Sequence, residues 1–585
     1  MSGVRQNFID LYKSFVRIKR IKKRIDMYKS SMKIFLVFAT TVLLFAGCSD
    51  KQGSQEKLIE RAGAPLLSGL GDHSHEITTK EPGAQKYFDQ GLVLAFAFNH
   101  AESIRSFQAA QRLDPECAMC FWGEALSRGP NINVTSDGKV VMSGDDRVRA
   151  FAALNTAKRL SLRASKKEQD YIDALSTRYN GDVVTDRNNL DLEYAKAMEE
   201  LSKEYPDDMD AASLFAESLM NTMPWNYWAD DGNPRPDTVK VVAALEGVLE
   251  KSPDHPLAIH LYIHAVEASS SPERAESAAD RLGLLVPGAG HLVHMPAHIY
   301  WRVGRYHDAS EANINAAKVD EEYIAQCNAQ GFYPALYYPH NIHFLWAASS
   351  MEGRSGLSIE SALKVAKYVN PDQIRQFPVV EFFHTIPLLS YVRFGKWEEI
   401  LDYPKPENEF KYSIGIYHYA RGVAQAAAGN TKEASFEQDQ ILPLIDTDEI
   451  KQLVKAGQPS ALLLEIANEL LLGQIQYSQG NYSQASGNFQ NAVELQDTLP
   501  YTEPPFWYYP SRQSLGNSLI KEGKFLAAEN VYRKDLLDYP RNGWSLYGLS
   551  LALEFQQKDI EAAEVKKRFE SIWQLSDIKL EASTL

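Results

Sequence analysis

The sequence predicts an all-α protein built as a solenoid of repeated helix pairs. The first observation is length: 585 residues exceed what one ordinary hydrophobic core serves, whereas each unit of a solenoid packs only on its neighbours. The second is a recurring order of small, aromatic, Ala and Pro positions, first seen at Gly91, Phe107, Ala110 and Pro115. A small residue lets two helices approach, the aromatic and Ala fill the groove between them, and Pro ends the second helix.

The same order of residues returns further along the chain. It is plainest in two carboxyl-terminal units, which contain Leu472, Gly473, Gly480, Tyr482, Ala485, Phe489 and Ala492, and then Leu515, Gly516, Gly523, Phe525, Ala528, Tyr532 and Pro540. A middle unit contains Tyr300, Gly304, Tyr306, Ala309 and Ala316. These offsets resemble the tetratricopeptide repeat (TPR). The resemblance implies a right-handed α-α superhelix, a TPR-like solenoid of about nine to eleven helix pairs over 81–585.

Two stretches interrupt the repeats, near 129–148 and 221–240, and we expect long loops there. Loops of that length in a compact body are often functional. The segments Gly129–Asn133 and Tyr338–His343 resemble segments of bacterial TPR-containing lipoproteins. That resemblance implies fold more than function.

Residues 32–47 have the layout of a bacterial lipoprotein signal peptide. A twelve-residue apolar run from Ile34 to Phe45 is too short to span a bilayer, and small residues lead from it into Cys48. The ending resembles a lipobox, so we expect a lipid (palmitate) anchor on Cys48 and a place in the cell envelope, at the outer membrane. A plain cleaved signal or a short anchor helix is the alternative. We interpret 1–31 as a basic extension from an upstream start site, and 48–80 as the lipidated Cys and a flexible tether.

Charge and cysteine content exclude several classes of protein. The net charge is -15, and because residues 1–47 carry +8, the rest of the chain carries -23. Such an acidic body disfavours nucleic acid as a partner. Four cysteines are too few for a disulfide scaffold. For Cys117 and Cys120, we expect a local disulfide or two buried thiols.

The spacing of histidines is the most informative chemical pattern. Eight of the 14 histidines lie between residues 260 and 343, and seven of these form the pattern: His260, His264, His291, His294, His298, His340 and His343. The separations His260 to His294 and His264 to His298 both equal one 34-residue repeat. These histidines therefore occupy equivalent places on the first helices of consecutive repeats.

In TPR arrays the first helices line the concave face, so we expect a ladder of histidines on the wall of a groove. A metal site there would use those seven histidines, with Glu217 and Glu267 as oxygen ligands. Imidazole ligands favour a transition metal, Zn, Cu or Fe. The alternatives are a metal-free polar groove for an acidic or peptide ligand, and histidines that only stack within the structure.

These patterns lead to three hypotheses about function. The first is a cell-envelope binding or scaffold protein that holds a protein or peptide in its concave groove. The second is a metalloprotein, such as a metal-dependent hydrolase or oxidase, although no motif assigns a catalytic residue. The third is a carbohydrate-binding outer-membrane lipoprotein, whose groove would offer aromatic rings for stacking. The aromatic residues proposed for the ligand groove are Trp225, Tyr227, Trp228, Tyr337 and Tyr338.

Overall fold

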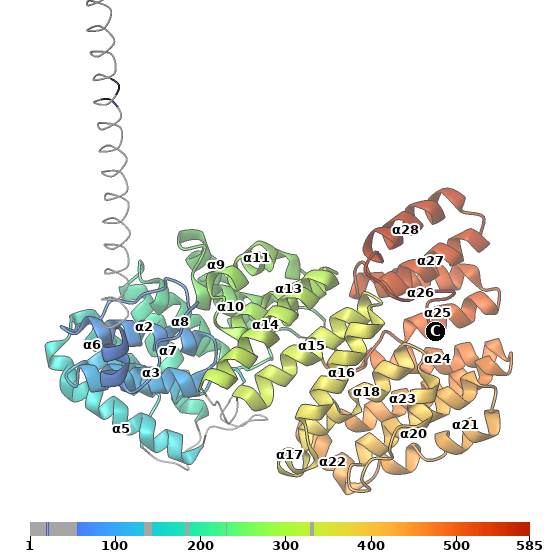
Figure 1. Cartoon of the computed structure of the whole chain (residues 1–585), viewed down its shortest axis with the longest axis horizontal. Helices are drawn as coiled ribbons and strands as arrows, with labels where there is room; N and C mark the ends of the chain where they lie inside the picture. Colours follow the sequence, from blue (N-terminus) through green and yellow to red (C-terminus); the bar gives the residue numbers. More distant parts are fainter. Residues whose placement is uncertain are drawn as a thin grey trace, which may run out of the picture. The chain divides into compact units, whose positions relative to one another are not determined.

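The computed structural model of the chain describes residues 19, 22, 55–133, 143–181, 187–229, 231–327 and 333–585. The chain divides into two compact units, Met1–Leu66 and Leu67–Leu585, and the description below concerns the second. Its regular structure is helical over these residues, which confirms the predicted all-α class (Figure 1). Cys48 and the predicted signal peptide lie outside the described residues.

Helix pairs follow one another along the chain, as the colours in Figure 1 show. The first helices of the pairs are α2 (Pro82–Phe96), α4 (Ala118–Ser127), α6 (Lys166–Ser176), α8 (Met209–Met220), α10 (Pro256–Val266), α12 (Gly290–His294) with α13 (Pro296–Arg302), α15 (Tyr338–Met351), α18 (Glu381–Arg393), α20 (Lys411–Ala427), α23 (Ser460–Ser478), α25 (Arg512–Lys521) and α27 (Gly543–Phe555). The second helices are α3 (His100–Leu113), α5 (Gly144–Leu160), α7 (Asn188–Glu204), α9 (Pro236–Lys251), α11 (Glu276–Leu285), α14 (Tyr306–Cys327), α16 (Ser355–Tyr368), α19 (Trp397–Leu401), α21 (Thr431–Gln438), α24 (Tyr482–Gln496), α26 (Phe525–Asp538) and α28 (Asp559–Ile572). Between pairs lie the short helices α17 (Pro371–Gln376) and α22 (Asp448–Lys455).

The small and aromatic positions of the repeat pack against each other as the sequence predicts. A Cβ atom added at Gly91 of α2 would lie 3.0 Å from the ring of Phe107 on α3, and one added at Gly123 of α4 would lie 2.2 Å from the same ring. One aromatic ring therefore fills the space between its own first helix and the next. In α23 and α24, Gly473 and Phe489 make the same contact at 2.4 Å. This packing is what makes the chain a TPR-like solenoid.

Glycines also end the first helices of the two plainest repeats. Gly480 follows α23 and Gly523 follows α25, both with φ +79. A residue with a Cβ rarely adopts this left-handed conformation, so glycine lets the chain turn sharply into the second helix.

Helices that are remote in sequence also meet. The indole N–H of Trp544 on α27 donates to the carbonyl oxygen of Ser350 on α15 over 3.0 Å. The backbone N–H groups of Ser355 and Gly356 donate to the carboxylate of Asp577, over 2.7 and 2.9 Å. The last helix pair is thus fixed to the pair formed by α15 and α16, an arrangement that no local sequence pattern predicts.

The predicted flexible tether is wrong in its second half, because the chain from residue 67 onward is held against the helices. The backbone N–H of Gly288 donates to the carbonyl oxygen of Gly69 over 2.7 Å. The backbone N–H of Thr78 donates to the carboxylate of Glu168 over 2.6 Å. The polar composition of this segment does not indicate these contacts, because the partners lie far away in the sequence.

Both predicted insertions give way to helix before their expected ends. Helix α5 begins at Gly144 because Ser143 caps it, accepting the N–H of Asp146. Helix α9 begins at Pro236, a residue suited to the first turn of a helix. Cys117 and Cys120 form a disulfide, which is one of the two alternatives expected for them. Among the described residues, no helix has both the length and the apolar character needed to cross a membrane.

Candidate metal centre

Six of the predicted histidines come together in two sets of three. In the first histidine set, His260, His264 and His291 each offer a ring nitrogen, and these atoms all lie within 4.8 Å of one another. In the second histidine set, His294, His298 and His340 meet the same limit.

The six histidines come together because they lie at equivalent places on the first helices of consecutive pairs. The first set comes from α10 and α12, and the second comes from α12, α13 and α15. Helix α10 contacts α13, and α12 contacts α15. Histidines that are one repeat apart in the sequence therefore lie next to each other in the structure.

Ring nitrogens within each set lie very close together. The Nε2 atoms of His260 and His291 are 3.2 Å apart, and those of His294 and His298 are 2.9 Å apart. Two such nitrogens need either a proton between them or a cation that both lone pairs bind.

The opposite ring nitrogens of His260 and His294 show where the proton of each of these two rings lies. The Nδ1–H of His260 donates to the carbonyl oxygen of Phe96 over 2.7 Å. The Nδ1–H of His294 donates to the side-chain oxygen of Asn313 over 2.7 Å, and the amide of Asn313 is fixed because its Nδ2 donates to the carbonyl of Ala309. A neutral imidazole with a proton on Nδ1 presents a lone pair on Nε2, the arrangement that outer partners impose on metal-bound histidine.

Glu267 connects the two histidine sets. Its Oε1 accepts from His264 Nδ1 at 3.0 Å, and its Oε2 accepts from His298 Nδ1 at 2.5 Å. A second carboxylate, that of Glu503, lies 3.3 Å from the same His298 nitrogen. The guanidinium of Arg302 contacts the backbone carbonyl of Glu267 and stacks over the ring of Tyr501.

Electrostatics make His298 differ from the other five histidines. Burial lowers the pKa of His298, but the carboxylates of Glu267 and Glu503 outweigh burial and raise it to about 10. Burial raises the pKa of Glu267, but His298 and His264 outweigh it and lower that pKa to about 2. Burial raises the pKa of Glu503 to about 6. Without a bound cation, a protonated His298 balances the charge of Glu267.

Burial keeps the remaining histidines in the neutral form that binds metal. It lowers the pKa of each of them, with further lowering from neighbouring histidine charge: these are His260, His264, His291, His294 and His340. The Nε2 of His264 and the Nδ1 of His291 are buried without a hydrogen-bond partner among the described residues. A buried ring nitrogen of this kind is costly unless something binds it.

The predicted open, histidine-lined groove is not confirmed, because five of the six side chains are buried and only His340 is half-buried. Segments from distant repeats cover them. The ring of Phe98 lies 4.5 Å from that of His260, and the ring of Tyr337 lies 4.7 Å from that of His291. The ring of Trp225 meets His264 edge-on at 5.0 Å, although Trp225 itself is 49% exposed. Trp225 and Tyr337 thus belong to the wall of the site.

Five predicted site residues lie outside the two sets. His343 stacks on Trp346 with 5.3 Å between ring centroids, and Glu217 lies beside Arg178. Tyr338 donates from its hydroxyl to Glu321, and Trp228 donates to the carbonyl of Ala265, while Tyr227 is buried. Each of these side chains is held by neighbours other than the two histidine sets, and the sequence alone does not indicate those neighbours.

The outer partners of the site were not predicted from the sequence. Asn313 lies on a second helix, Glu503 lies 205 positions after His298, and Phe96 contributes a backbone carbonyl. A backbone oxygen leaves no side-chain signal, and the spacing to Glu503 depends on how many repeats intervene. No local pattern could have identified them.

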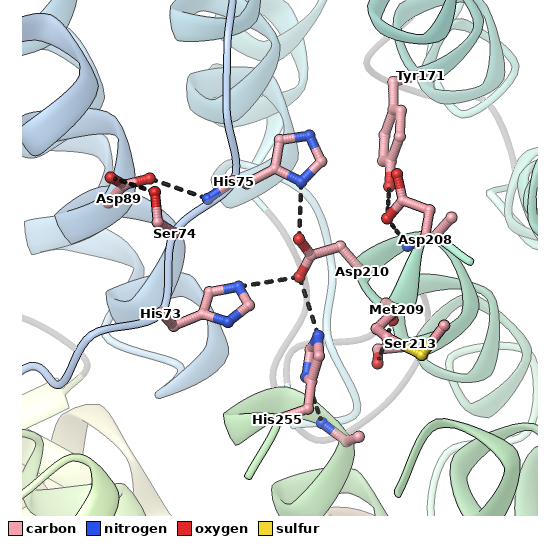
Figure 2. Close-up of polar contacts among 12 residues, drawn as sticks. His73, Ser74, His75, Asp89, Tyr171, Asp208, Met209, Asp210, Ser213 and His255 are labelled. Carbon is pink, nitrogen blue, oxygen red and sulfur yellow. Dashed lines mark hydrogen bonds and ion pairs between the residues drawn. The ribbon is translucent and has the colours of Figure 1, made fainter. Parts of the chain in front are cut away.

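A second cluster of histidines, also missed, surrounds Asp210. Figure 2 shows His73, His75 and His255 directed at its carboxylate, with nitrogen–oxygen distances of 3.0, 2.7 and 3.1 Å. His255 caps α10, since its Nδ1 accepts the N–H of Ala258, so its proton lies on Nε2 and is donated to Asp210. Both nitrogens of His255 are therefore occupied, and the cluster serves to attach the segment after residue 67 to α8 and α10.

Known proteins show only a distant likeness to this chain. No family model matches the chain, and no curated protein sequence matches it. Similar solved structures include a human IFIT1 dimer with m7Gppp-AAAA (12% identity, 88% of this chain and 93% of that chain, TM-score 0.31). Others are yeast Tom70 (13% identity, 86% and 93%, TM-score 0.26) and the P58(IPK) TPR domain (13% identity, 63% and 98%, TM-score 0.16). On the packing of its own helix pairs, the chain is a TPR-like solenoid.

Proposed function

We propose that this chain is a transition-metal-binding protein whose metal is held by the two histidine sets. The observation that carries the proposal is the convergence of Nε2 atoms at 3.2 and 2.9 Å while oxygen acceptors hold the Nδ1 atoms of His260, His294 and His298. Imidazole ligands favour Zn, Cu or Fe over Ca or Mg.

The proposal includes chemistry at the metal. Three protein ligands leave one coordination position open, as in catalytic zinc sites, whereas structural sites are usually closed by four. An open position suits a metal-dependent hydrolase or oxidase. We also propose that Cys48 carries a lipid that holds the chain in the cell envelope, since the residues before it resemble a lipobox.

Metal analysis of the full mature chain tests metal binding. We expect protein purified without a histidine tag, or reloaded with Cu, Zn or Fe, to retain stoichiometric metal, and a variant with His264→Ala and His298→Ala to lose most of it. His307→Ala is the matched control, because His307 is 50% exposed and outside both sets. Negligible metal in the reloaded wild-type protein would rule out the proposal.

A second candidate function is a scaffold for a protein or peptide partner. Solenoids offer extended surfaces for binding, and the last two helix pairs expose apolar side chains at Leu526 (61%), Phe555 (54%) and Ile560 (80%). Crosslinked pull-down from envelope extracts with the wild-type chain should recover a partner that is lost when all three become Ser. Equal recovery with both chains would argue against this surface.

A further inference from the structure

We propose that the two histidine sets form one dinuclear copper centre, in which each set binds one ion. This inference rests on the proposed metal binding. It adds the number of ions, their neighbouring positions and the identity of the metal.

The number of ions follows from the donor count and spacing. Imidazole nitrogens bind such metals at about 2.0–2.1 Å, so two of them on one tetrahedral or trigonal ion lie about 3.3–3.6 Å apart. The Nε2 separations of 3.2 Å in the first set and 2.9 Å in the second are slightly shorter than this range, so small side-chain movements would admit an ion. An ion at an open protein site usually takes three protein ligands. Six imidazoles in two compact sets therefore provide for two ions.

The two ions would be neighbours. The rings of His264 and His298, from different sets, have centroids 5.4 Å apart, and those of His291 and His294 are 5.9 Å apart. Glu267 holds His264 with one carboxylate oxygen and His298 with the other. One rigid carboxylate thus fixes both sets, and their open coordination positions can share one bridging ligand.

The donor atoms favour copper. Di-iron and di-manganese sites in helical proteins include carboxylate ligands. Here both oxygens of Glu267 are occupied by Nδ1 protons, and Glu503 approaches the Nδ1 of His298. All-imidazole sites rank copper first among the divalent first-row ions, and singly charged Cu(I) is less costly to bury than a dication.

The surroundings limit what the centre can bind. Aromatic rings of Phe98, Trp225 and Tyr337 pack on the first set, and Phe344 packs on His294 and His298 of the second. These rings therefore enclose both sets on the sides that they occupy. We infer a small ligand that bridges both ions, of the class of dioxygen, for which azide is the experimental probe.

Copper titration of the full chain tests the inference. The protein is loaded with Cu(I) under nitrogen against a chelator, and the bound copper is counted. After oxidation and addition of azide, electron paramagnetic resonance (EPR) measures uncoupled Cu(II). We expect about two copper ions per chain and an EPR signal far below two spins, since bridged ions couple magnetically.

Variants of each set separate the two ions. We expect H260Q/H264Q and H294Q/H340Q each to retain about one copper per chain, now with the EPR signal of an isolated Cu(II). H307Q, outside both sets, should behave as wild type. Circular dichroism reports whether each variant folds. If the double variants do not fold, H340Q alone tests the second set, because His340 is the least buried of the six.

The outcomes distinguish this inference from the proposed function. No copper and no other metal in the wild-type chain overturns both. One copper per chain leaves metal binding intact but overturns the dinuclear centre. Two copper ions with two full uncoupled EPR signals overturn the pairing, and full loading with zinc but not copper overturns the choice of metal.

Discussion

At the scale of single residues, the centre depends on acceptors that orient its imidazoles. Asn313 accepts the Nδ1–H of His294 and is itself fixed by the backbone of its own helix. An outer partner of this kind sets the ring orientation and the proton position of a metal ligand without touching the metal.

Replacing Asn313 by Ala should therefore weaken metal affinity about 10–100-fold while the protein stays folded. Competition with a chelator measures the affinity. Asn315→Ala is the matched control, because Asn315 lies on the same helix but is exposed. Equal affinity in both variants would show that Asn313 does not orient His294.

The attachment of the segment after residue 67 should depend on pH. Burial lowers the pKa of His75, but the carboxylate of Asp210 outweighs burial, so the pKa of His75 is raised. Burial raises the pKa of Asp210, but hydrogen bonds from His255, His73 and His75 outweigh burial and lower that pKa well below its usual value. A His pKa that is raised on folding stabilises the fold below the unfolded pKa of about 6.5. This stabilisation is lost as the pH rises through the pKa of the folded state. An Asp pKa that is lowered on folding stabilises the fold above the unfolded pKa of about 3.9. This stabilisation is lost as the pH falls through the pKa of the folded state.

The contribution of this pair is therefore largest between about pH 4 and 6.5. We expect His75→Gln to lower the free energy of unfolding most in that window and less at pH 9. Urea unfolding at pH 5.5 and pH 9 measures the difference. An effect of the same size at both values would mean that only neutral hydrogen bonding is involved.

At the scale of helices, the repeat pattern acts through close contacts between glycine and an aromatic ring. The Cβ of an alanine at position 473 would lie 2.4 Å from the ring of Phe489, which forces the two helices of the pair apart. Gly487, on the partner helix, has nothing within 4 Å of its Cβ position.

Gly473→Ala should thus destabilise the pair by about 1–3 kcal/mol through overpacking. Gly487→Ala should stabilise it by about 0.5–1 kcal/mol through helix propensity. Hydrogen exchange over α23 and α24 reports these local effects better than global melting, because repeat arrays do not always unfold in one step. Similar protection in both variants would contradict the packing argument.

Histidine periodicity also acts at the scale of helices. His260 and His264 on α10 and His294 and His298 on α12–α13 were predicted at equivalent places from the 34-residue spacing alone, and these helices are neighbours. Repeat spacing is a local property of the sequence, so it indicates which helices carry histidines at equivalent places. It does not indicate the neighbours of each side chain: His343 packs on Trp346 and lies outside both sets.

At the scale of the whole molecule, the proposed lipid anchor is the feature that the amino-terminal sequence predicts. Replacing Cys48 by Ala should move the protein from the membrane fraction to the soluble fraction, because a diacylated cysteine supplies two acyl chains of membrane affinity. Fractionation with immunoblotting measures this. A chain that stays with the membrane after the change would contradict lipidation at Cys48.

Patterns in the amino-acid order were enough to predict the helical class, the register of the repeats and the helices that carry the histidines. These features depend on short-range periodicity, which can be read directly from the order of the residues. The division of six histidines into two sets, with Phe96, Asn313 and Glu503 as outer partners, depends instead on tertiary contacts. Those contacts join segments up to 205 positions apart, and they depend on small packing angles summed over many helix pairs, which no single repeat encodes.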